Sequence, residues 1–452
     1  MSQSLPQAIL TQVAALGAAL VVAARAHPDG TLAEHERAVR TAVQAALPGL
    51  LGAVVSLATQ DLDAGIAAVA RRCPRCDRRV RPRGWRPRTV QTTCGPLRYS
   101  RPWYQCPACR HGFSPADATL RVAPRARVSA ALEAWVVRLN VATTQREAAA
   151  LLTELTGVLV GMDTIREHTT AVGEVVAAAD AAAIAHVQAT GEAAERVAAA
   201  PGALVVEADG AMVRYTDGWH EVKVGVVGGV QDGDLTAASY IAAREPAEAF
   251  GPRLLAEAAR RGALSVVRWE GPLTRPGLGV LRPVHIVGDG APWIWNLAGD
   301  YFGERTEVVD FYHAAEHLWT VAHALYGVGS ADATVWAQAR IEELRKRGAD
   351  PVRAALAQTT AATTETAELL RRERGYFATN AARMDYPTIA AQGLPIGSGA
   401  VESSAKHVVQ QRMKRPGQRW SCRGATAMLA LRARYASARP LSGCPSSPPA
   451  PH

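Results

Sequence analysis

The sequence predicts a mixed α/β protein in which a sheet-containing core follows several smaller N-terminal modules. Three observations lead to this prediction. From about residue 203, strand-type runs are followed by strand–helix units, an order typical of an α/β sheet. Residues 71–120 are rich in Arg, Pro and Cys. The segments on either side of that stretch are rich in Ala and have helical periodicity.

Length, composition and charge limit the class of protein. The chain has 452 residues, of which 48% are hydrophobic and 20% charged, as in a soluble globular protein of roughly two to four domains. The net charge of +9 is uneven, because residues 71–110 hold twelve arginines and one acid, and residues 402–439 hold nine basic side chains and one acid. Two basic segments suggest a polyanionic partner; the alternative is that the arginines only keep the protein soluble.

Residues 1–70 are expected to form helices that pack or oligomerise. Thr31 is followed three positions later by Glu34, the spacing of a capping box. The stretch Ala14–Ala24 is interpreted as a helix and not a signal peptide, because no Lys or Arg precedes it. We expect no membrane span, on the view that no uncharged apolar run reaches about 18–20 residues. Seven cysteines in so long a chain do not indicate a secreted disulfide scaffold, so we expect a cytoplasmic protein.

Residues 71–120 are expected to form a zinc ribbon that binds DNA. Cys73 and Cys76 form one CxxC pair, and Cys106 and Cys109 a second; together they supply four thiolates to one tetrahedral Zn²⁺. The alternative, two redox dithiols, is disfavoured because no βαβ pattern surrounds either pair. Cys94 could replace a ligand, although a small core residue is the favoured interpretation. The ribbon arginines expected to contact DNA are Arg78, Arg79, Arg81, Arg83 and Arg86.

Residues 121–180 resemble a helix-turn-helix unit. Gly157 is expected to end one helix and Asp163 to cap the next. The recognition helix would be about Asp163–Ala171, offering Thr164, Arg166 and His168 to DNA. The connection is longer than the usual 3–4 residues, so a helical hairpin that binds nothing is the alternative. Residues 176–200 are interpreted as an Ala-rich helical connector.

The period then changes to that of strands, and residues 195–330 are expected to form the first part of the core. The run ALVVEADG reads as a buried strand, and the next two strands are joined through Asp217-Gly218, a hairpin signal. Two strand–helix units follow, at PVHIVGDGAPWIWNL and RTEVVDFYHAAEHL. Three antiparallel strands followed by strand–helix units indicate an α/β sheet of ribonuclease-H type.

The remainder of the chain is expected to complete this core. Residues 331–390 read as an all-helical insertion, residues 391–437 as a glycine-rich loop with the last core helices, and residues 438–452 as a disordered Pro/Ser-rich tail.

Three carboxylates are candidate catalytic residues. Asp209 and Asp289 each end a strand, where open α/β sheets place their sites. Glu402 follows Gly397-Ser398-Gly399, whose glycines allow close approach of the backbone. Such acids repel one another and favour two Mg²⁺ or Mn²⁺ ions, which would activate a water or a 3′-hydroxyl and stabilise the leaving oxygen. The alternative is that each Asp-Gly forms a turn and that Glu402 only favours a helix N-terminus.

Other polar residues are candidates for supporting roles. Lys406 could pair with Glu402 at i,i+4 or reach a phosphate. Asp310 and His313 could form a hydrogen bond at a strand–helix junction, or His313 could orient a phosphate; we favour the hydrogen bond. The remaining residues expected to grip the DNA backbone or stack on its bases are Arg412, Lys414, Arg415, Arg419 and Trp420.

The blocks VVEADGAMV, VGDGAPWIWNLA…VVDFYHAAEHL and LPIGSGAVESSAKHVVQQRMKRPGQRWS are together similar to the ISKra-type (ISKra-four) insertion-sequence transposases. The similarity runs from about Cys73 to Tyr435. It implies a ribonuclease-H-like DDE core in which Asp209, Asp289 and Glu402 bind the metal ions, with the helices between Asp289 and Glu402 as an insertion. It also places Asp310 and His313 where many relatives keep an Asp-x-x-His pair. The tail after Arg439 and Cys94 depart from the family pattern.

The resulting hypothesis is a transposase that binds element ends, cuts DNA with Mg²⁺ and joins it to a target. Its partner would be double-stranded DNA, and we expect a homo-oligomer on DNA in the nucleoid. One alternative is a metal-dependent nuclease without strand transfer. Another is a non-catalytic, zinc-containing DNA-binding protein derived from a transposase.

Overall fold

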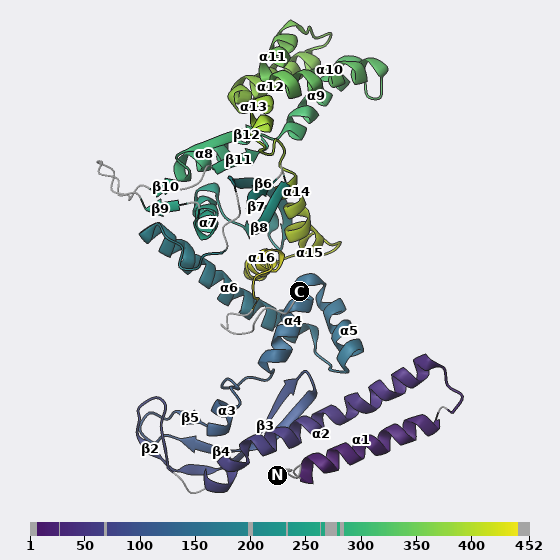
Figure 1. The fold of residues 1–452 in the computed structure, drawn as a ribbon, viewed down its shortest axis with the longest axis vertical. Coiled ribbons are helices and arrows are strands. Elements are labelled where there is room, and N and C mark those ends of the chain that lie inside the picture. Colours follow the sequence, from purple (N-terminus) through teal and green to yellow (C-terminus); the bar gives the residue numbers. More distant parts are fainter. Residues whose placement is uncertain are drawn as a thin grey trace. The chain divides into compact units, whose positions relative to one another are not determined.

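The fold is mixed α/β and forms two compact units, Met1–Thr169 and Thr170–His452. The computed structural model describes residues 7–26, 28–66, 70–197, 202–231, 234–262, 264–266, 278–280 and 284–441 (Figure 1). The tail predicted to be disordered therefore lies outside the described residues from 442 onward.

Unit 1 begins with a helical hairpin made of α1 (Gln7–Ala26) and α2 (Leu32–Ile66). The carboxylate of Glu34 accepts the Thr31 backbone N–H at 2.7 Å, which is one half of the predicted capping box. None of the residues of α1 is buried, and Val22 is 67% exposed. The hairpin therefore leaves one apolar helix largely in solvent.

The expectation that no segment is long enough to span a membrane is wrong. The helices α1, Leu32–Thr59 of α2 and α6 (Met162–Thr190) are long and apolar enough to cross one, by length and composition alone. No charged residue stands between Gln7 and Ala24, so this uncharged apolar run does reach the length of about 18–20 residues that a membrane span requires.

The cysteine-rich segment forms a small antiparallel structure. Its long hairpin holds β3 (Pro82–Thr92) against β4 (Gly95–Gln105). Asp117 on the short helix α3 lies between the buried guanidinium of Arg88, at 2.6 Å, and that of Arg101. This ion-pair cluster fixes α3 against the hairpin. The remaining strands are β1 (Arg71–Arg72), β2 (Arg79–Val80) and β5 (Gly112–Phe113), and α3 is Pro115–Thr119.

A three-helix unit follows, made of α4 (Ala130–Ala142), α5 (Gln145–Thr156) and the start of α6. Gly157 ends α5 in the left-handed conformation at φ +72°, as predicted. The prediction that Asp163 caps the next helix is wrong, because α6 begins at Met162. Since α6 continues to Thr190, the recognition helix and most of the expected connector are one helix.

Unit 2 contains a five-stranded sheet in the order β12-β11-β6-β7-β8. The strands β6, β7 and β8 form an antiparallel meander, β11 pairs with β6 in parallel, and β12 pairs with β11 in parallel. Figure 1 shows α7 on one side of this sheet and α14 on the other. The bounds are β6 Leu204–Tyr215, β7 Gly218–Gln231, β8 Asp234–Ala243, α7 Ala247–Arg260, β9 Leu264–Val266, β10 Leu278–Val280, β11 Val284–Gly288, α8 Pro292–Tyr301, β12 Arg305–Val309 and α14 Gly399–Ser404.

The helical segment expected between residues 331 and 390 is helical, and it shares its core with the sheet. Val287 of β11 and Leu318 of α9 belong to the same buried cluster as Leu356 of α11 and Phe377 of α12. The insertion and the sheet therefore pack as one body. The bounds are α9 Phe311–Tyr326, α10 Ala331–Arg347, α11 Ala349–Gln358, α12 Thr364–Asn380, η1 Ala381–Arg383 and α13 Tyr386–Ala391.

The helix that carries Glu402 contains a π-helical segment. It runs as α14, then η2 (Ala405–Gln410, π-helical), then α15 (Gln411–Met413). The guanidinium of Arg432, on α16 (Cys422–Ala436), donates to the carbonyl oxygens of His407 and Val408. Because a π-turn alters the normal i→i−4 pairing, this buried arginine stabilises it by satisfying both carbonyls.

The pair His168–Glu133 should make the stability of unit 1 depend on pH. The His168 ring lies 2.6 Å from the Glu133 carboxylate, and this hydrogen bond raises the pKa of His168. Stability from the pair is present below the ordinary histidine pKa of about 6.5 and is lost as pH rises through the raised pKa. We expect His168→Gln to reduce the fall in melting temperature between about pH 6 and pH 8, measured by thermal unfolding. His186→Gln, at an exposed position on the same helix, should leave the fall unchanged; equal slopes in all three proteins would contradict the prediction.

Candidate functional site

Four cysteines of unit 1 lie close enough together to hold a zinc ion. The Sγ atoms of Cys73, Cys76, Cys106 and Cys109 lie within 4.8 Å of one another, with 3.6 Å between Cys73 and Cys109 and 3.5 Å between Cys76 and Cys106. Zn–S bonds of about 2.3 Å in a tetrahedron require S···S distances of about 3.8 Å. The four thiols therefore already have nearly the spacing of a structural zinc site.

Both CxxC pairs form the same turn. Asp77 and Arg110, each directly after a second cysteine, have positive φ values of 59° and 56°. The Cys73 N–H donates to the Arg78 carbonyl and the Cys106 N–H to the His111 carbonyl, each at 2.9 Å. The backbone N–H groups of Cys109 and Ala108 lower the pKa of Cys106 to about 6, which favours the thiolate that binds metal.

Cys94 is neither a ligand nor a core residue. It lies in the turn between β3 and β4, where its N–H donates to Thr92 Oγ1. The whole length of β4 separates it from Cys106, so it cannot replace one of the four thiols.

The purified protein should contain one zinc ion per chain. Cys106→Ser is expected to remove it, because three thiolates and a hydroxyl bind zinc more weakly than four thiolates. The metal content is measured by mass spectrometry after purification under reducing conditions. Cys94→Ser is the matched control and should keep the full equivalent. Absence of zinc from the wild-type protein would exclude the ribbon.

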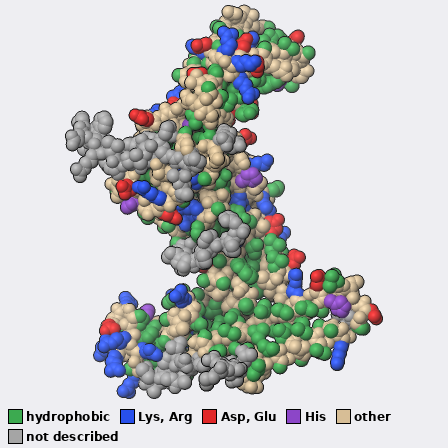
Figure 2. Space-filling model, in the orientation of Figure 1, with side chains coloured by type: hydrophobic (Ala, Val, Ile, Leu, Met, Phe, Trp, Pro, Cys, Tyr) green, Lys and Arg blue, Asp and Glu red, His purple; other side chains and the backbone are tan. Residues whose placement is uncertain are grey.

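The ribbon also carries an exposed basic surface. Arg78, Arg79, Arg81, Arg83 and Arg86 are all exposed, and Figure 2 shows Lys and Arg side chains gathered at the lower left, over the ribbon strands. Arg86 lies over the Trp103 ring at 4.9 Å, an aromatic and cationic pair of the kind that binds nucleic acid. In the three-helix unit, Arg166 is 57% exposed and pairs with Asp163, whereas His168 is held by Glu133.

In unit 2, Asp209 and Asp289 come from neighbouring strands. Asp289 directly follows β11, as predicted, and β11 pairs with β6 in parallel. The prediction that Asp209 ends its strand is wrong, because β6 continues to Tyr215 and Asp209 lies within it. Burial raises the pKa of Asp209, and the charges of Asp289 and Glu221 raise it further. The Gly210 N–H and His313 lower this pKa, but the net shift is upward. The two aspartates are thus close enough to repel each other in a partly buried setting.

Glu207 is a site residue that the sequence analysis missed. It is 2% exposed, and its carboxylate accepts the Val401 N–H at 2.6 Å. Successive residues of a strand alternate between faces, so Glu207 and Asp209 both lie on the face covered by α14. Burial raises the pKa of Glu207 to about 7, although the hydrogen bond from Val401 lowers it. Its position two residues before Asp209 was the signal available in the sequence.

Glu402 lies in the first turn of α14 and is exposed. The helix packs against β6 and β7, the strands on which Asp209 and Glu221 lie. In the part of the chain that the structure describes, Glu402 does not join Asp209 and Asp289 in a group whose oxygens all lie within 4.8 Å. The structure therefore brings the two aspartates together and leaves Glu402 on the adjacent helix.

Asp310 connects the end of β12 to the loop before Glu402. Its carboxylate caps α9 by accepting the Tyr312 N–H at 2.7 Å and the His313 N–H at 3.4 Å. It also accepts the N–H and the hydroxyl of Ser398. The contact between Asp310 and His313 thus uses the backbone of His313. The His313 ring is instead near Asp209, whose pKa it lowers.

The helical insertion reaches the same site. The Tyr376 hydroxyl donates to the Asp289 carbonyl at 3.3 Å, and its ring stacks on His317 at 3.8 Å. The buried Glu373 carboxylate lies 2.5 Å from His317. These residues of α12 hold α9 and the Asp289 turn together, and no motif in the sequence marks them.

Two residues assigned to DNA binding, Arg412 and Trp420, are held by contacts within unit 2. Arg412 is 2% exposed and lies over the Trp420 ring at 5.0 Å. The Trp420 indole N–H donates to the Met413 carbonyl, and its backbone pairs with the end of β6. A basic sequence pattern does not distinguish a buried guanidinium from an exposed one. Of the remaining set, Lys406, Lys414 and Arg419 are exposed and Arg415 is half-buried.

The ion pair between Glu402 and Lys406 is not found among the described residues. Both side chains are exposed, and the helix becomes π-helical at Ala405. The change in periodicity removes the i,i+4 alignment that such a pair requires.

Comparison of the chain with protein-family models gives no match, and no curated protein matches it.

Glu207→Ala should destabilise unit 2 more than Glu207→Gln. Glutamine keeps an oxygen that can accept the Val401 N–H, whereas alanine leaves that buried N–H without an acceptor, at a cost of about 1–3 kcal/mol. Urea unfolding of the two variants measures the difference. Equal free energies of unfolding would show that the hydrogen bond does not hold α14 in place.

Proposed function

We propose that the protein is a DDE transposase of the ISKra type with a ribonuclease-H-like core. The observation that best supports the proposal is the parallel pairing of β11 with β6, because it brings Asp209 and Asp289 side by side. The strand order supports it too: a three-stranded antiparallel meander is extended on the β6 side by two parallel strands. This is the sheet expected from the similarity to the family.

The donor set fits hard divalent cations. Asp209 and Asp289 offer carboxylate oxygens, which Mg²⁺ and Mn²⁺ prefer, and their mutual repulsion favours a bound cation over an empty site. Two such ions, when bound, would activate a water or a 3′-hydroxyl and stabilise the leaving oxygen. The chain's own part is to hold the two aspartates on the sheet and to deliver Glu402 from α14. Lys406, on the exposed face of the same helix, is available to contact the phosphate backbone.

DNA binding is proposed for the exposed arginines of the ribbon and for the exposed basic residues after Glu402. Each phosphate contact releases counterions, so affinity should fall steeply with salt. The buried Arg88 and Arg412 and the partly buried Arg101, which pairs with Asp117, are not part of this surface. Double-stranded element ends and target DNA are the proposed partners, and the nucleoid is the proposed location.

Self-association through the helical hairpin is proposed as well. The helix α1 buries none of its residues, and Val13, Val21 and Val22 are each at least half exposed. Pairing of two hairpins would cover these side chains and give the homo-oligomer that joining two DNA ends requires.

Asp289→Asn should abolish cleavage and leave DNA binding intact. Loss of one carboxylate weakens the metal site, so the cleavage rate should fall more than about 100-fold. This is a larger loss than the 10–100-fold that is typical when a residue hydrogen-bonded to a metal ligand is replaced. Binding, which depends on remote arginines, should stay within about a factor of three. Labelled duplexes carrying the DNA that flanks the gene are incubated with Mg²⁺, and cleavage and strand joining are followed on gels.

Asp300→Asn is the matched control, since Asp300 is an exposed aspartate on α8. It should cleave and join as the wild type does. Retained cleavage by Asp289→Asn would remove Asp289 from the mechanism. Nicks without joined products would indicate a nuclease, and binding alone would indicate a non-catalytic DNA-binding protein.

A further inference from the structure

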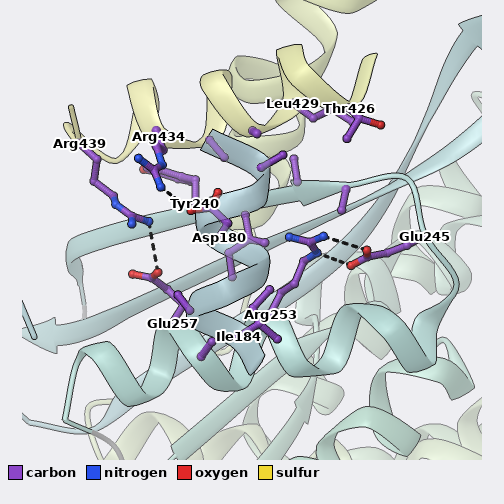
Figure 3. A pocket seen from close by; sticks show the side chains of 18 of the residues that line it. Asp180, Ile184, Tyr240, Glu245, Arg253, Glu257, Thr426, Leu429, Arg434 and Arg439 are labelled. Carbon is purple, nitrogen blue, oxygen red and sulfur yellow. Dashed lines mark hydrogen bonds and ion pairs between the residues drawn. The ribbon is translucent and has the colours of Figure 1, made fainter. Parts of the chain in front are cut away.

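A cavity of about 110 Å³ lies in unit 2, away from Asp209 and Asp289. It is enclosed by α6, β8, α7 and α16, and Figure 3 shows its charged side chains converging from these elements. Asp180 comes from α6, Arg253 and Glu257 from α7, and Arg434 from α16; Arg439 follows that helix.

The charges that line the cavity do not balance. Five arginines and three carboxylates line it: Arg244, Arg253, Arg260, Arg434 and Arg439 against Asp180, Glu245 and Glu257. Two of the arginines have a carboxylate of their own, because Arg253 pairs with Glu245 at 2.5 Å and Arg434 with Asp180 at 2.7 Å. The third carboxylate, Glu257, is shared by Arg260 and Arg439. Two carboxylates outside the lining also contribute, because Arg260 lies 3.5 Å from the exposed Glu195 and Arg244 lies 3.8 Å from Asp217.

Glu257 lies much closer to Arg260 than to Arg439. Both carboxylate oxygens of Glu257 lie 2.8 Å from one guanidinium nitrogen of Arg260, whereas Arg439 comes no closer than 3.8 Å. Burial lowers the pKa of Arg439, and the neighbouring charge of Arg260 lowers it further. Glu257 and Asp180 act in the opposite direction, but neither is in close contact with Arg439, which is therefore a partly buried and weakly compensated cation; such a charge is costly.

Two further N–H groups at the cavity have no hydrogen-bond partner among the residues that the structure describes. They are the Nε groups of Arg260 and Arg434, whose side chains are 7% and 14% exposed. An unpaired buried donor of this kind costs free energy unless something accepts its hydrogen bond. The cavity thus offers a weakly paired cation, Arg439, together with N–H donors that no protein group accepts from.

The size of the cavity limits what can occupy it. Its 110 Å³ corresponds to about four waters, at about 30 Å³ for each water. Pockets that bind nucleotide-sized ligands are usually about 300–1,000 Å³. A single tetrahedral oxyanion fits in this space.

We propose that this cavity binds one phosphate group, held by Arg439 together with Arg260 and Arg434. A phosphate oxygen is an acceptor for guanidinium N–H groups, and its negative charge would give Arg439 the close partner that Glu257, at 3.8 Å, does not supply. Bound there, it would join the C-terminal end of α16 to α7 and α6. The group can come from free phosphate or from a DNA phosphodiester. This inference is independent of the proposed function, because it is tested without DNA cleavage.

Calorimetric titration of the full-length protein with inorganic phosphate, at constant ionic strength, tests the proposal. The wild type should bind one phosphate saturably. Arg439→Gln should weaken binding at least tenfold, because it removes the least compensated cation. The matched control is Arg371→Gln, a 74% exposed arginine on α12, which should bind as the wild type does.

Removal of a carboxylate should have the opposite effect. Glu245→Gln leaves Arg253 without its charged partner and should tighten phosphate binding, whereas loss of a structural ion pair alone would not. Glu257→Gln should act in the same direction, and Glu245→Gln decides the matter if that variant does not fold. Absence of saturable binding to the wild type, or wild-type affinity in Arg439→Gln, would overturn the proposal.

A repeat titration in the presence of duplex DNA identifies the source of the phosphate group. If the site takes a phosphodiester, DNA should weaken the apparent phosphate affinity of the wild type. If it takes free phosphate, the affinity should be unchanged.

Discussion

The parallel pairing of β11 with β6 is the constraint on which the rest of unit 2 depends. Its register sets Val287 opposite Glu207, so that Asp289 and Asp209, each two residues further on, lie side by side at the point where β11 ends and β6 continues. The apolar core below them is buried and cannot shift to separate the charges. The packing of the sheet therefore keeps the two carboxylates close together although they repel each other. Binding of a proton or a cation relieves this repulsion.

A second pair of buried acids, Glu207 and Asp310, attaches the start of α14 and the loop before it to this part of the sheet. Glu207 holds the start of α14 through the Val401 N–H, and Asp310 holds Ser398 just before it. The insertion contributes as well, since Tyr376 reaches the Asp289 carbonyl. The helices between residues 331 and 390 thus help to build the site and are not an appendage. Glu402 follows directly from the segment that these contacts fix.

Much of this arrangement could be predicted from the sequence, and the failures have physical causes. The CxxC spacing and the position of Asp289 directly after a strand are local patterns, so both could be read directly. The continuation of β6 past Asp209 could not, because Gly210 looks like a turn residue but pairs with Lys223 of β7. Burial is not local: Arg412 looked like a DNA contact, yet it packs on Trp420 inside the fold. The π-turn after Glu402 depends on Arg432 from another helix. The predicted recognition helix and the Ala-rich connector were assigned separately, yet they form one helix, α6. The ribonuclease-H-like assignment remains a proposal based on strand order and similarity.

The central claim is that Asp209, Asp289 and Glu402 converge on a common metal site. The most direct measurement is anomalous diffraction from crystals of the full-length protein grown with Mn²⁺. The account predicts manganese between Asp209 and Asp289, with the Glu402 carboxylate as a further ligand. Manganese bound elsewhere, or bound to the two aspartates while Glu402 stays in solvent, would contradict it.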